Sequence, residues 1–543
     1  MMPYIYNKVK LTACRLLLLL LTMALTCCGA SVPEDAKSVA RKAHVLPDND
    51  GATLPPNIAP LNVEVLEPGD AYVVRYYTKG GTEIVSGSNP SDISLADWRE
   101  LLSVARGDTL YTDIYVKNDG HWSRFQTLKN PVATDSIDAY VTYRLIQPSY
   151  VDYEDMTIRQ RDVSNFDERI VFHNMMLSED EKGQCINCHV PQNQNRTGHS
   201  LFHVRQLKGG TVLIDKHTAT KVNLKTDSTL SAGVYPAWHP LNDQLIAFSV
   251  NETGQVFHTR DIQKIEVIDF GSNLILYDAA KNQVYDIDCR ADEFETFPTW
   301  SPDGQWLYYV SAHYEQQSDN IDAELNSAYP LLKYNIYRRS FDARTKKFGE
   351  RELVFDAAAI GKSASTPRVS PDGKWLLFAL ADFGQFHIWH SSSRLYAMPT
   401  GIGTEGKEPL TDVHPALDTD WGAASYHSFS SNGRWVVFSS RRDDGNYTRL
   451  YIAYFDRNGQ MHKPFLLPQR SPRYYGQLFR SYNVPEFLAQ PVAPSLNDLT
   501  RVVDQTALQA EYAGSSLQVP EARHGVSRQL DDTKQSVVSS VAY

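Results

Sequence analysis

Cys185 and Cys188 stand three positions apart, and His189 follows the second cysteine directly, in the run Cys-Ile-Asn-Cys-His. Two thiols at this spacing can each add to one vinyl group of a single porphyrin, and the adjacent imidazole can then bind the iron. The spacing therefore predicts one covalently attached haem c, with Cys185 and Cys188 as its thioether links and His189 as the proximal iron ligand.

Two other interpretations use the same cysteines. A Cys-x-x-Cys pair can be half of a zinc site, but a second pair of ligands is then needed, and the next cysteine is Cys289. A redox-active dithiol is expected after a strand of a βαβ unit, whereas the polar stretch 178–184 precedes this pair. Both alternatives stay open, and haem attachment is preferred.

A second axial ligand for the iron would have to come from elsewhere in the chain. The preferred candidate is His203, because its neighbours Phe202 and Val204 favour burial beside a porphyrin. His199 lies in polar surroundings and is the second choice, and Met175 or Met176 is the third. If no side chain binds there, the open position would permit ligand binding or catalysis.

The N-terminus carries an export signal. Three basic residues precede an apolar run over 16–26, which is too short to span a bilayer and is typical of a signal peptide. The run ends in Leu-Thr-Cys-Cys-Gly, which resembles a bacterial lipobox. Residues 1–28 are therefore predicted to be a lipoprotein signal with Cys28 as the lipidated residue. Cys27 as the lipidated residue, and an ordinary cleavable signal, are the alternatives. Haem c is attached outside the cytoplasmic membrane, so the two motifs agree.

Composition limits the possible partners. The chain has 543 residues with 53 basic and 64 acidic side chains, and a net charge of −11 argues against a nucleic-acid partner. Of the six cysteines, five are assigned to the signal peptide, the lipid anchor or the haem. Only Cys289 remains, so no structural disulfide is expected. No other apolar run approaches membrane-spanning length, so membrane contact is predicted through the lipid anchor alone.

The first third of the mature chain divides into three predicted parts. Residues 29–55 are polar and predict a flexible tether. Residues 56–165 contain short alternating strands, which favour a β-sandwich of the immunoglobulin or fibronectin kind, with one helix over 94–104. Residues 166–205 are predicted to be a haem-binding linker between this domain and the next.

The second half contains an internal repeat. Its copies begin at Pro236, Pro298, Pro367 and His427, so they start 62, 69 and 60 residues apart. Each copy passes through a turn, Pro-Asp-Gly or Ser-Asn-Gly in the last three, into an apolar strand. Four such strand-turn-strand units cannot each bury their own faces, but a radial arrangement buries all of them.

These copies resemble the TolB-like (WD40-like) class of β-propeller, whose repeats carry a Trp-Ser-Pro-Asp-Gly pattern, here at 300–304. The third copy has Arg368-Val369 where tryptophan is usual. The resemblance implies an all-β protein with a propeller over 206–485, in which four blades are visible and a fifth or sixth is degenerate. The remainder, 486–543, is predicted to be a partly disordered extension.

Three functions follow as expectations. The first is an exported mono-haem cytochrome that transfers electrons in the cell envelope, with an envelope redox or scaffold protein as partner. The second is a TolB-like binding or scaffold protein whose haem is structural or sensory. The third is a haem-dependent oxidoreductase with substrate beside an open iron position. No nucleophile elbow, P-loop or dinucleotide fingerprint points to another chemistry.

Overall fold

The computed structural model describes residues 30–148, 156–177, 185–258, 261, 263–290, 292–318, 320–401, 414–415, 422–517 and 537–538. These residues form two compact units. The first contains the chain up to Gly51, Pro60–Val132 and Gln469–Arg473, and the second contains Ala52–Ala59, Ala133–Pro468 and Tyr474 onward. The predicted signal peptide and Cys28 lie outside the described residues.

The first unit contains one six-stranded sheet with a helix. The strands run in the order β1 (Lys37–Ser38), β7 (His121–Arg124), β6 (Thr109–Asn118), β4 (Ala71–Tyr77) and β5 (Glu83–Ser86), and β8 (Leu128–Pro131) also pairs with β6. A separate two-stranded ladder joins β2 (Val45–Leu46) to β3 (Glu64–Val65).

The helix α2 (Leu95–Ala105) confirms the predicted helix, and Ser94 caps its first turn through the backbone N–H of Asp97. The side chains of Trp98, Leu101 and Leu102 are fully buried, because they lie on the face that packs on the sheet.

Two predictions for this region are wrong. The described strands form a single main sheet with a helix, not the two packed sheets of a sandwich. The segment predicted as a flexible tether belongs to the folded unit, since β1 pairs with β7 and β2 pairs with β3. Polar composition concealed these strands because they are short edge strands with little to bury.

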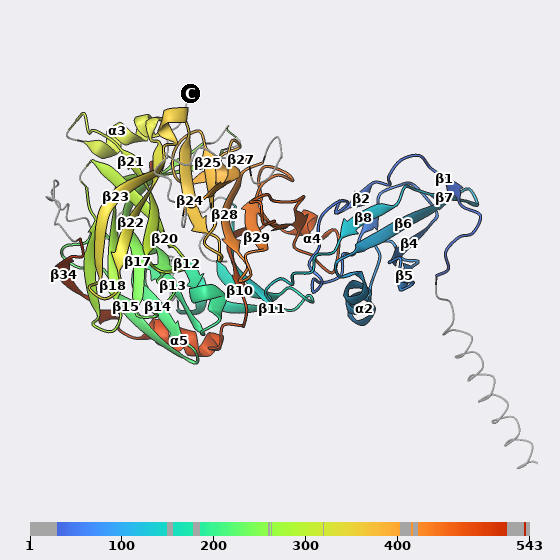
Figure 1. Cartoon of the computed structure of the whole chain (residues 1–543), viewed down its shortest axis with the longest axis horizontal. Coiled ribbons are helices and arrows are strands. Elements are labelled where there is room, and N and C mark those ends of the chain that lie inside the picture. Colours follow the sequence, from blue (N-terminus) through green and yellow to red (C-terminus); the bar gives the residue numbers. More distant parts are fainter. Residues whose placement is uncertain are drawn as a thin grey trace, which may run out of the picture. The chain divides into compact units, whose positions relative to one another are not determined.

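The described strands of the second unit form a β-propeller of six four-stranded blades. Blade 1 contains β12 (Cys185–Pro191), β13 (His199–Arg205), β14 (Gly210–Asp215) and β15 (Thr218–Asn223). Blade 2 contains β16 (Val234–Trp238), β17 (Leu245–Phe257), β18 (Ile265–Asp278) and β19 (Gln283–Asp288). Blade 3 contains β20 (Glu293–Trp300), β21 (Trp306–His313), β22 (Tyr334–Asp342) and β23 (Lys347–Phe355). Figure 1 labels many of these strands, among them β17, β18, β22 and β23. A single bridge between β18 and β20 joins the sheets of blades 2 and 3.

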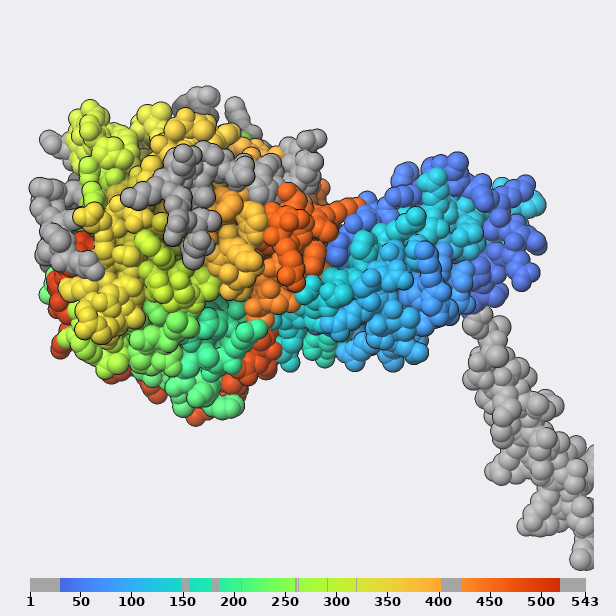
Figure 2. Space-filling view, viewed as in Figure 1, coloured from blue at the N-terminus to red at the C-terminus, as the bar shows by residue number. Residues whose placement is uncertain are grey.

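Blade 4 contains β24 (Ser363–Val369), β25 (Trp375–Ala381), β26 (Arg394–Pro399) and β27 (His414–Pro415). Blade 5 contains β28 (Ala424–Phe429), β29 (Trp435–Ser440), β30 (Arg449–Tyr454) and β31 (Phe465–Leu466). Blade 6 contains β32 (Ser481–Leu488), β9 (Tyr140–Ile146), β10 (Thr157–Asp162) and β11 (Glu168–His173). Figure 2 shows successive parts of this unit adjoining in chain order, from green through yellow to orange.

The six inner strands close a ring. Each of β12, β16, β20, β24, β28 and β32 contacts the next, and β32 contacts β12. Tryptophans of the repeat bind one blade to the one before it. The Nε1 of Trp238 donates to the carbonyl of Val190 over 3.2 Å, and the Nε1 of Trp300 donates to that of Ala237 over 3.1 Å. This explains why the repeat carries tryptophan at the end of its inner strand.

The turn residues of the repeat form the hairpin turns that the sequence predicts. In blade 3, Ser301 Oγ donates to Asp303 Oδ1 over 2.5 Å and accepts from the backbone N–H of Trp306. Gly304 has φ of +70°, which glycine adopts without the clash that a side chain would cause. Blades 4 and 5 repeat this arrangement at 370–375 and 430–435.

The predicted limits of the propeller are wrong at both ends. Strands β9–β11, which were assigned to the sandwich and the linker, pair with β32 from the C-terminal part of the chain. Residues 185–205, which were also assigned to the linker, form the two inner strands of blade 1. The ring is therefore closed by strands more than 300 residues apart in sequence, a pairing that local patterns do not contain.

The segment predicted as a loose extension is folded over most of its described part. Helix α5 (Leu496–Asp504) begins at Ser495, where a capping box joins Ser495 and Asp498. Two further strands, β33 (Leu508–Gln509) and β34 (Glu511–Ser515), add to the outer edges of blades 1 and 2. The short β35 (Val537–Val538) pairs with β17. Within the described ranges, no helix has the length and apolar character to cross a membrane.

Candidate functional site

Every inner strand of the propeller carries the same β-bulge, in which two residues lie opposite one residue of the second strand. The first residue of each bulge has a left-handed φ between +46° and +53°; the six are Cys188, Tyr235, Phe297, Thr366, Tyr426 and Val484. The residue opposite the bulge is a buried aromatic in all six blades: Phe202, Phe248, Tyr309, Phe378, Phe438 and Tyr143. The second bulge residue is proline in four blades and histidine in two.

Cys188 and His189 are the bulge of blade 1. The propeller repeat therefore sets the backbone of the Cys-x-x-Cys-His motif, on the innermost strand β12. Cys185 and Cys188 are both buried, and neither forms a disulfide. The Sγ of Cys188 accepts a hydrogen bond of 3.4 Å from the backbone N–H of Tyr235 in blade 2. Burial raises the pKa of the Cys188 thiol, and the charges of Arg205 and Arg144 act against this rise.

The imidazole of His189 lies on the opposite side of β12 from the Cys188 thiol, against blade 6. Burial lowers its pKa to about 3, helped by the nearby charge of Arg144 and opposed by the backbone of Thr142 and Val484. The ring is therefore neutral at ordinary pH, which is the form that binds metals. Its Nε2 is buried and has no hydrogen-bond partner among the described residues.

The preferred second axial ligand lies elsewhere. Phe202 and Val204 of β13 pack in the core shared with blade 6, whereas Leu201 packs in the core shared with blade 2. Because side chains alternate along a strand, His203 faces blade 2, and its Nδ1 lies 3.1 Å from the hydroxyl of Thr211.

His199 alternates in the same way, and its Nε2 lies 3.1 Å from Asp215 Oδ1. The structure thus places His199 and His203 on the face of the sheet opposite to His189. Met175 and Met176 lie in a short 3-10 turn after β11.

Three aromatic bulge side chains pack in one cluster at the inner strands of the propeller. Tyr235 and Phe297 stack with ring centroids 4.2 Å apart, and Tyr426 packs against the same cluster although it comes from the far side of the ring. Tyr235, Tyr426 and Val484 are partly exposed even though their strands are the innermost ones. Aromatic rings therefore lie at the inner strands beside the buried Cys188.

An extended hairpin covers the end of the axis at which the inner strands begin. Strands β17 and β18 continue well past the other strands of blade 2, and their tip packs on Phe386 and Trp389 of the loop after β25 in blade 4. There, His390 Nε2 lies 2.7 Å from Glu266 Oε2, and both side chains are almost fully buried. The hairpin restricts access to the axis from this end.

The residues at the motif fit a covalently held haem in their chemistry. Both thiols are free, the adjacent imidazole is neutral with an unpartnered nitrogen, and apolar rings surround the nearby axis. Among the described residues, no group of three or more His, Cys, Asp or Glu could hold a bare metal ion.

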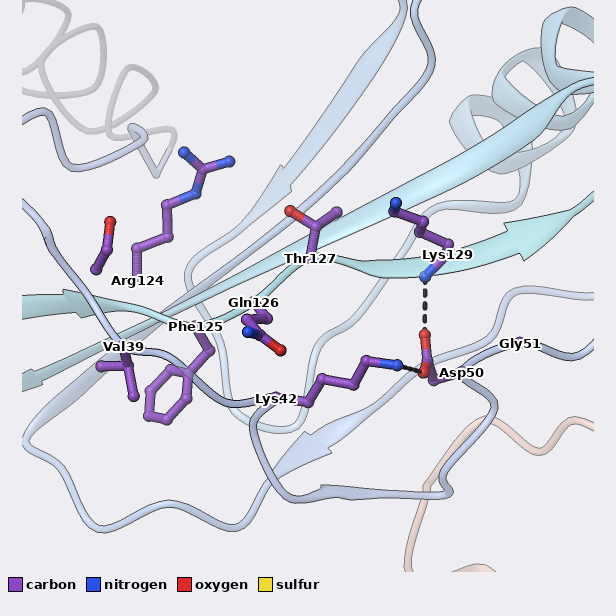
Figure 3. Close-up of a pocket in the computed structure, with 10 residues that line it drawn as sticks. Val39, Lys42, Asp50, Gly51, Arg124, Phe125, Gln126, Thr127 and Lys129 are labelled. Atoms are coloured by element: carbon purple, nitrogen blue, oxygen red, sulfur yellow. Dashed lines mark hydrogen bonds and ion pairs between the residues drawn. The ribbon is translucent and has the colours of Figure 1, made fainter.

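A hollow of about 630 Å³ lies in the first unit and contains none of the predicted site residues (Figure 3). Its charges are compensated within the unit. Asp50 pairs with Lys42 and accepts from the backbone N–H of Lys129 over 2.9 Å, and Arg124 donates to Asp113 over 2.9 Å. These contacts stabilise the edge of the sheet, and we assign the hollow no chemistry.

Sequence reasoning missed two neighbours of the motif. Arg144 of blade 6 and Tyr235 of blade 2 contact the motif, although they lie 41 and 50 residues from Cys185 in the sequence. One signal was available. The aromatic residues Phe202 and Tyr143 continue the series that the four recognised copies carry at the same place in the second strand.

Comparison with known proteins gives fold similarity alone. No family model matches the chain, and no curated protein matches it. The crystal structure of TolB from Acinetobacter baumannii is 15% identical, covers 74% of this chain and 86% of its own, and has a TM-score of 0.39. An oligogalacturonate lyase in complex with manganese is 13% identical, covers 77% and 99%, and has a TM-score of 0.28.

Prolyl oligopeptidase B from Galerina marginata is 8% identical, covers 76% of this chain and 54% of its own, and has a TM-score of 0.33. The chain is a β-propeller protein by virtue of its six closed blades, and TolB is among the solved structures to which it is similar.

Proposed function

We propose that this chain is an exported protein with one haem c, bound through Cys185 and Cys188, and that it transfers electrons in the cell envelope. One observation carries the proposal. Two free, buried thiols on the innermost strand of the propeller are followed by an imidazole whose Nε2 has no hydrogen-bond partner in the part of the chain that the structure describes. When bound, the haem would supply an iron that alternates between the ferric and ferrous states.

The protein's own residues have distinct roles in this proposal. The two thiols hold the porphyrin, and His189, kept neutral by burial, is available to the iron. The aromatic side chains at the axis exclude water, which holds the site at a low dielectric. The export signal and Cys28 would place the propeller outside the cytoplasmic membrane on a lipid anchor, where an envelope redox or scaffold protein is the expected partner.

The test is covalent attachment. The full chain is expressed in a host with cytochrome c maturation, and a haem stain on a denaturing gel is combined with a pyridine haemochrome spectrum. We expect a stained band for the parent and none for the Cys185→Ser/Cys188→Ser variant. The matched control is Cys289→Ser, since Cys289 is a third described cysteine, and it should stain like the parent. An unstained parent of unmodified mass would overturn the proposal.

A second candidate function is favoured by the position of the other histidines. His199 and His203 face blade 2, whereas His189 faces blade 6, so neither lies across a common site from it. An iron with one open position would bind small ligands and could act in a haem-dependent oxidoreductase. Carbon monoxide separates the two functions. No spectral change of the ferrous protein favours electron transfer through a six-coordinate iron, and rapid binding favours the oxidoreductase.

A further inference from the structure

Two arginines lie beside the motif, and they come from different blades. Arg144 is buried on β9 of blade 6, and its Nη1 donates to Asn187 Oδ1 over 2.6 Å and to the carbonyl of Ile186 over 3.4 Å. These are the two residues between the cysteines. Arg205 ends β13 of blade 1, is partly exposed, and pairs with Cys185 across the ladder.

Both arginines adjoin the motif by their geometry. Arg144 is bonded to the two residues between the cysteines, and Arg205 lies directly opposite Cys185 in the ladder of β12 and β13.

We propose, on the basis of the haem assignment above, that Arg144 and Arg205 bind the two propionate carboxylates of the porphyrin. A carboxylate that leaves water needs a cationic partner, because an unpaired buried charge is very costly. Arginine remains charged in any protein environment and binds a carboxylate through two parallel N–H groups. The number of guanidinium groups beside Cys188 matches the number of acidic groups on a haem.

The position of Arg144 gives it a second effect. Its bonds to Asn187 and Ile186 hold the segment between the thiols, so a carboxylate bound to the same guanidinium would be tied to the covalent links. Positive charge near the iron also favours the ferrous state over the ferric state by simple Coulomb attraction. Loss of either arginine should therefore lower the reduction potential while the thioether links remain.

The first test measures that potential. Arg205→Gln, Arg144→Gln and Arg144→Lys are compared with the parent holoprotein by redox titration, and Arg159→Gln on the adjacent strand β10 is the matched control. Arg205→Gln should shift the reduction equilibrium at least tenfold toward the ferric form, about 59 mV for a one-electron couple. Arg144→Lys should recover part of the shift seen with Arg144→Gln, and the control should not shift. Parent-like potentials in both glutamine variants would overturn the assignment.

The second test removes the covalent links and uses the carboxylates directly. The Cys185→Ser/Cys188→Ser variant is titrated with protoporphyrin IX and with its dimethyl ester, and binding is followed by porphyrin fluorescence. The ester should bind at least tenfold more weakly, adding Arg205→Gln should reduce this ratio, and adding Arg144→Gln as well should bring it close to one. Equal binding of acid and ester to the starting variant would refute the role of the arginines and leave the haem proposal intact. Binding of neither porphyrin, with an unstained parent, would overturn the haem proposal itself.

Discussion

The bulge of blade 1 and the bulge of blade 5 have the same backbone and place a histidine at the same point. In blade 5, His427 Nε2 lies 3.0 Å from the carbonyl of Leu377 in the preceding blade, and burial lowers its pKa to about 3. In blade 1, His189 has a pKa lowered to the same value, but its Nε2 has no hydrogen-bond partner among the residues described, and two cysteines precede it. The propeller therefore explains a buried neutral imidazole at this point, and it explains neither the thiol pair nor the unpartnered nitrogen.

The largest expected effect is a change in the absorption spectrum of the iron, and it distinguishes the two histidines. Proline occupies the same position in the other four blades, so His189→Pro and His427→Pro should each fold with a loss of about 1–2 kcal/mol. In the matured holoprotein, only His189→Pro should change the absorption bands that report an iron–imidazole bond. Spectra and urea unfolding are measured for both variants. A His189→Pro spectrum identical to the parent's would show that His189 is not the ligand.

The next effect tests whether the core residues opposite the two bulges contribute equally to the free energy of unfolding. Phe202 lies opposite the bulge of blade 1 and Phe438 lies opposite that of blade 5, and both are buried. Phe202→Ala and Phe438→Ala should each lose about 3–5 kcal/mol of unfolding free energy, because each leaves a cavity between blades. Chemical denaturation of the colourless, thiol-free chain gives the comparison without haem. Losses that differ by more than a factor of two would contradict the equivalence.

A smaller effect appears in the pH dependence of stability. The pKa of His427 is about 3 in the folded chain and about 6.5 when unfolded, so below pH 6.5 the unfolded chain takes up a proton that the folded chain does not. Stability due to this group is present above pH 6.5 and falls by about 1.4 kcal/mol per pH unit toward pH 3. His427→Pro should show a shallower decline in urea unfolding between pH 6.5 and 4.5. An unchanged slope would mean that His427 is protonated in the folded chain.

The smallest effect concerns the backbone of the bulge. Thr366 adopts φ of +48°, which is strained for a β-branched residue, and its hydroxyl is buried without a partner among the described residues. Thr366→Gly removes that strain and the unpaired hydroxyl, but it also increases the conformational entropy of the unfolded chain. Its unfolding free energy should stay within about 1 kcal/mol of the parent value in a thermal or urea melt. In contrast, Tyr426→Gly should lose more, because the ring packs at the axis.

Local patterns were enough for much of the propeller. The hairpin turns at 301–304, 370–373 and 430–433 form as their serine, aspartate and glycine indicate, and the four recognised copies are blades 2 to 5. Blade 1 lacks the turn sequence of the repeat. Blade 6 combines three strands that precede blade 1 in the sequence with one strand that follows blade 5. Repeat detection fails for such blades, because their aromatic and bulge positions are kept while the turn is not.

The amino-acid sequence alone determined the chemistry that this chain can offer: two thiols and an imidazole at haem-attachment spacing behind a predicted export signal, and turns that form β-hairpins. Those features depend on residues within a few positions of one another. The tertiary structure alone decided that the motif lies on an innermost strand, that His203 faces away from His189, and that Arg144 and Tyr235 adjoin it. The reason is ring closure, since β32 must pair with β9 before blade 6 exists to bury the imidazole.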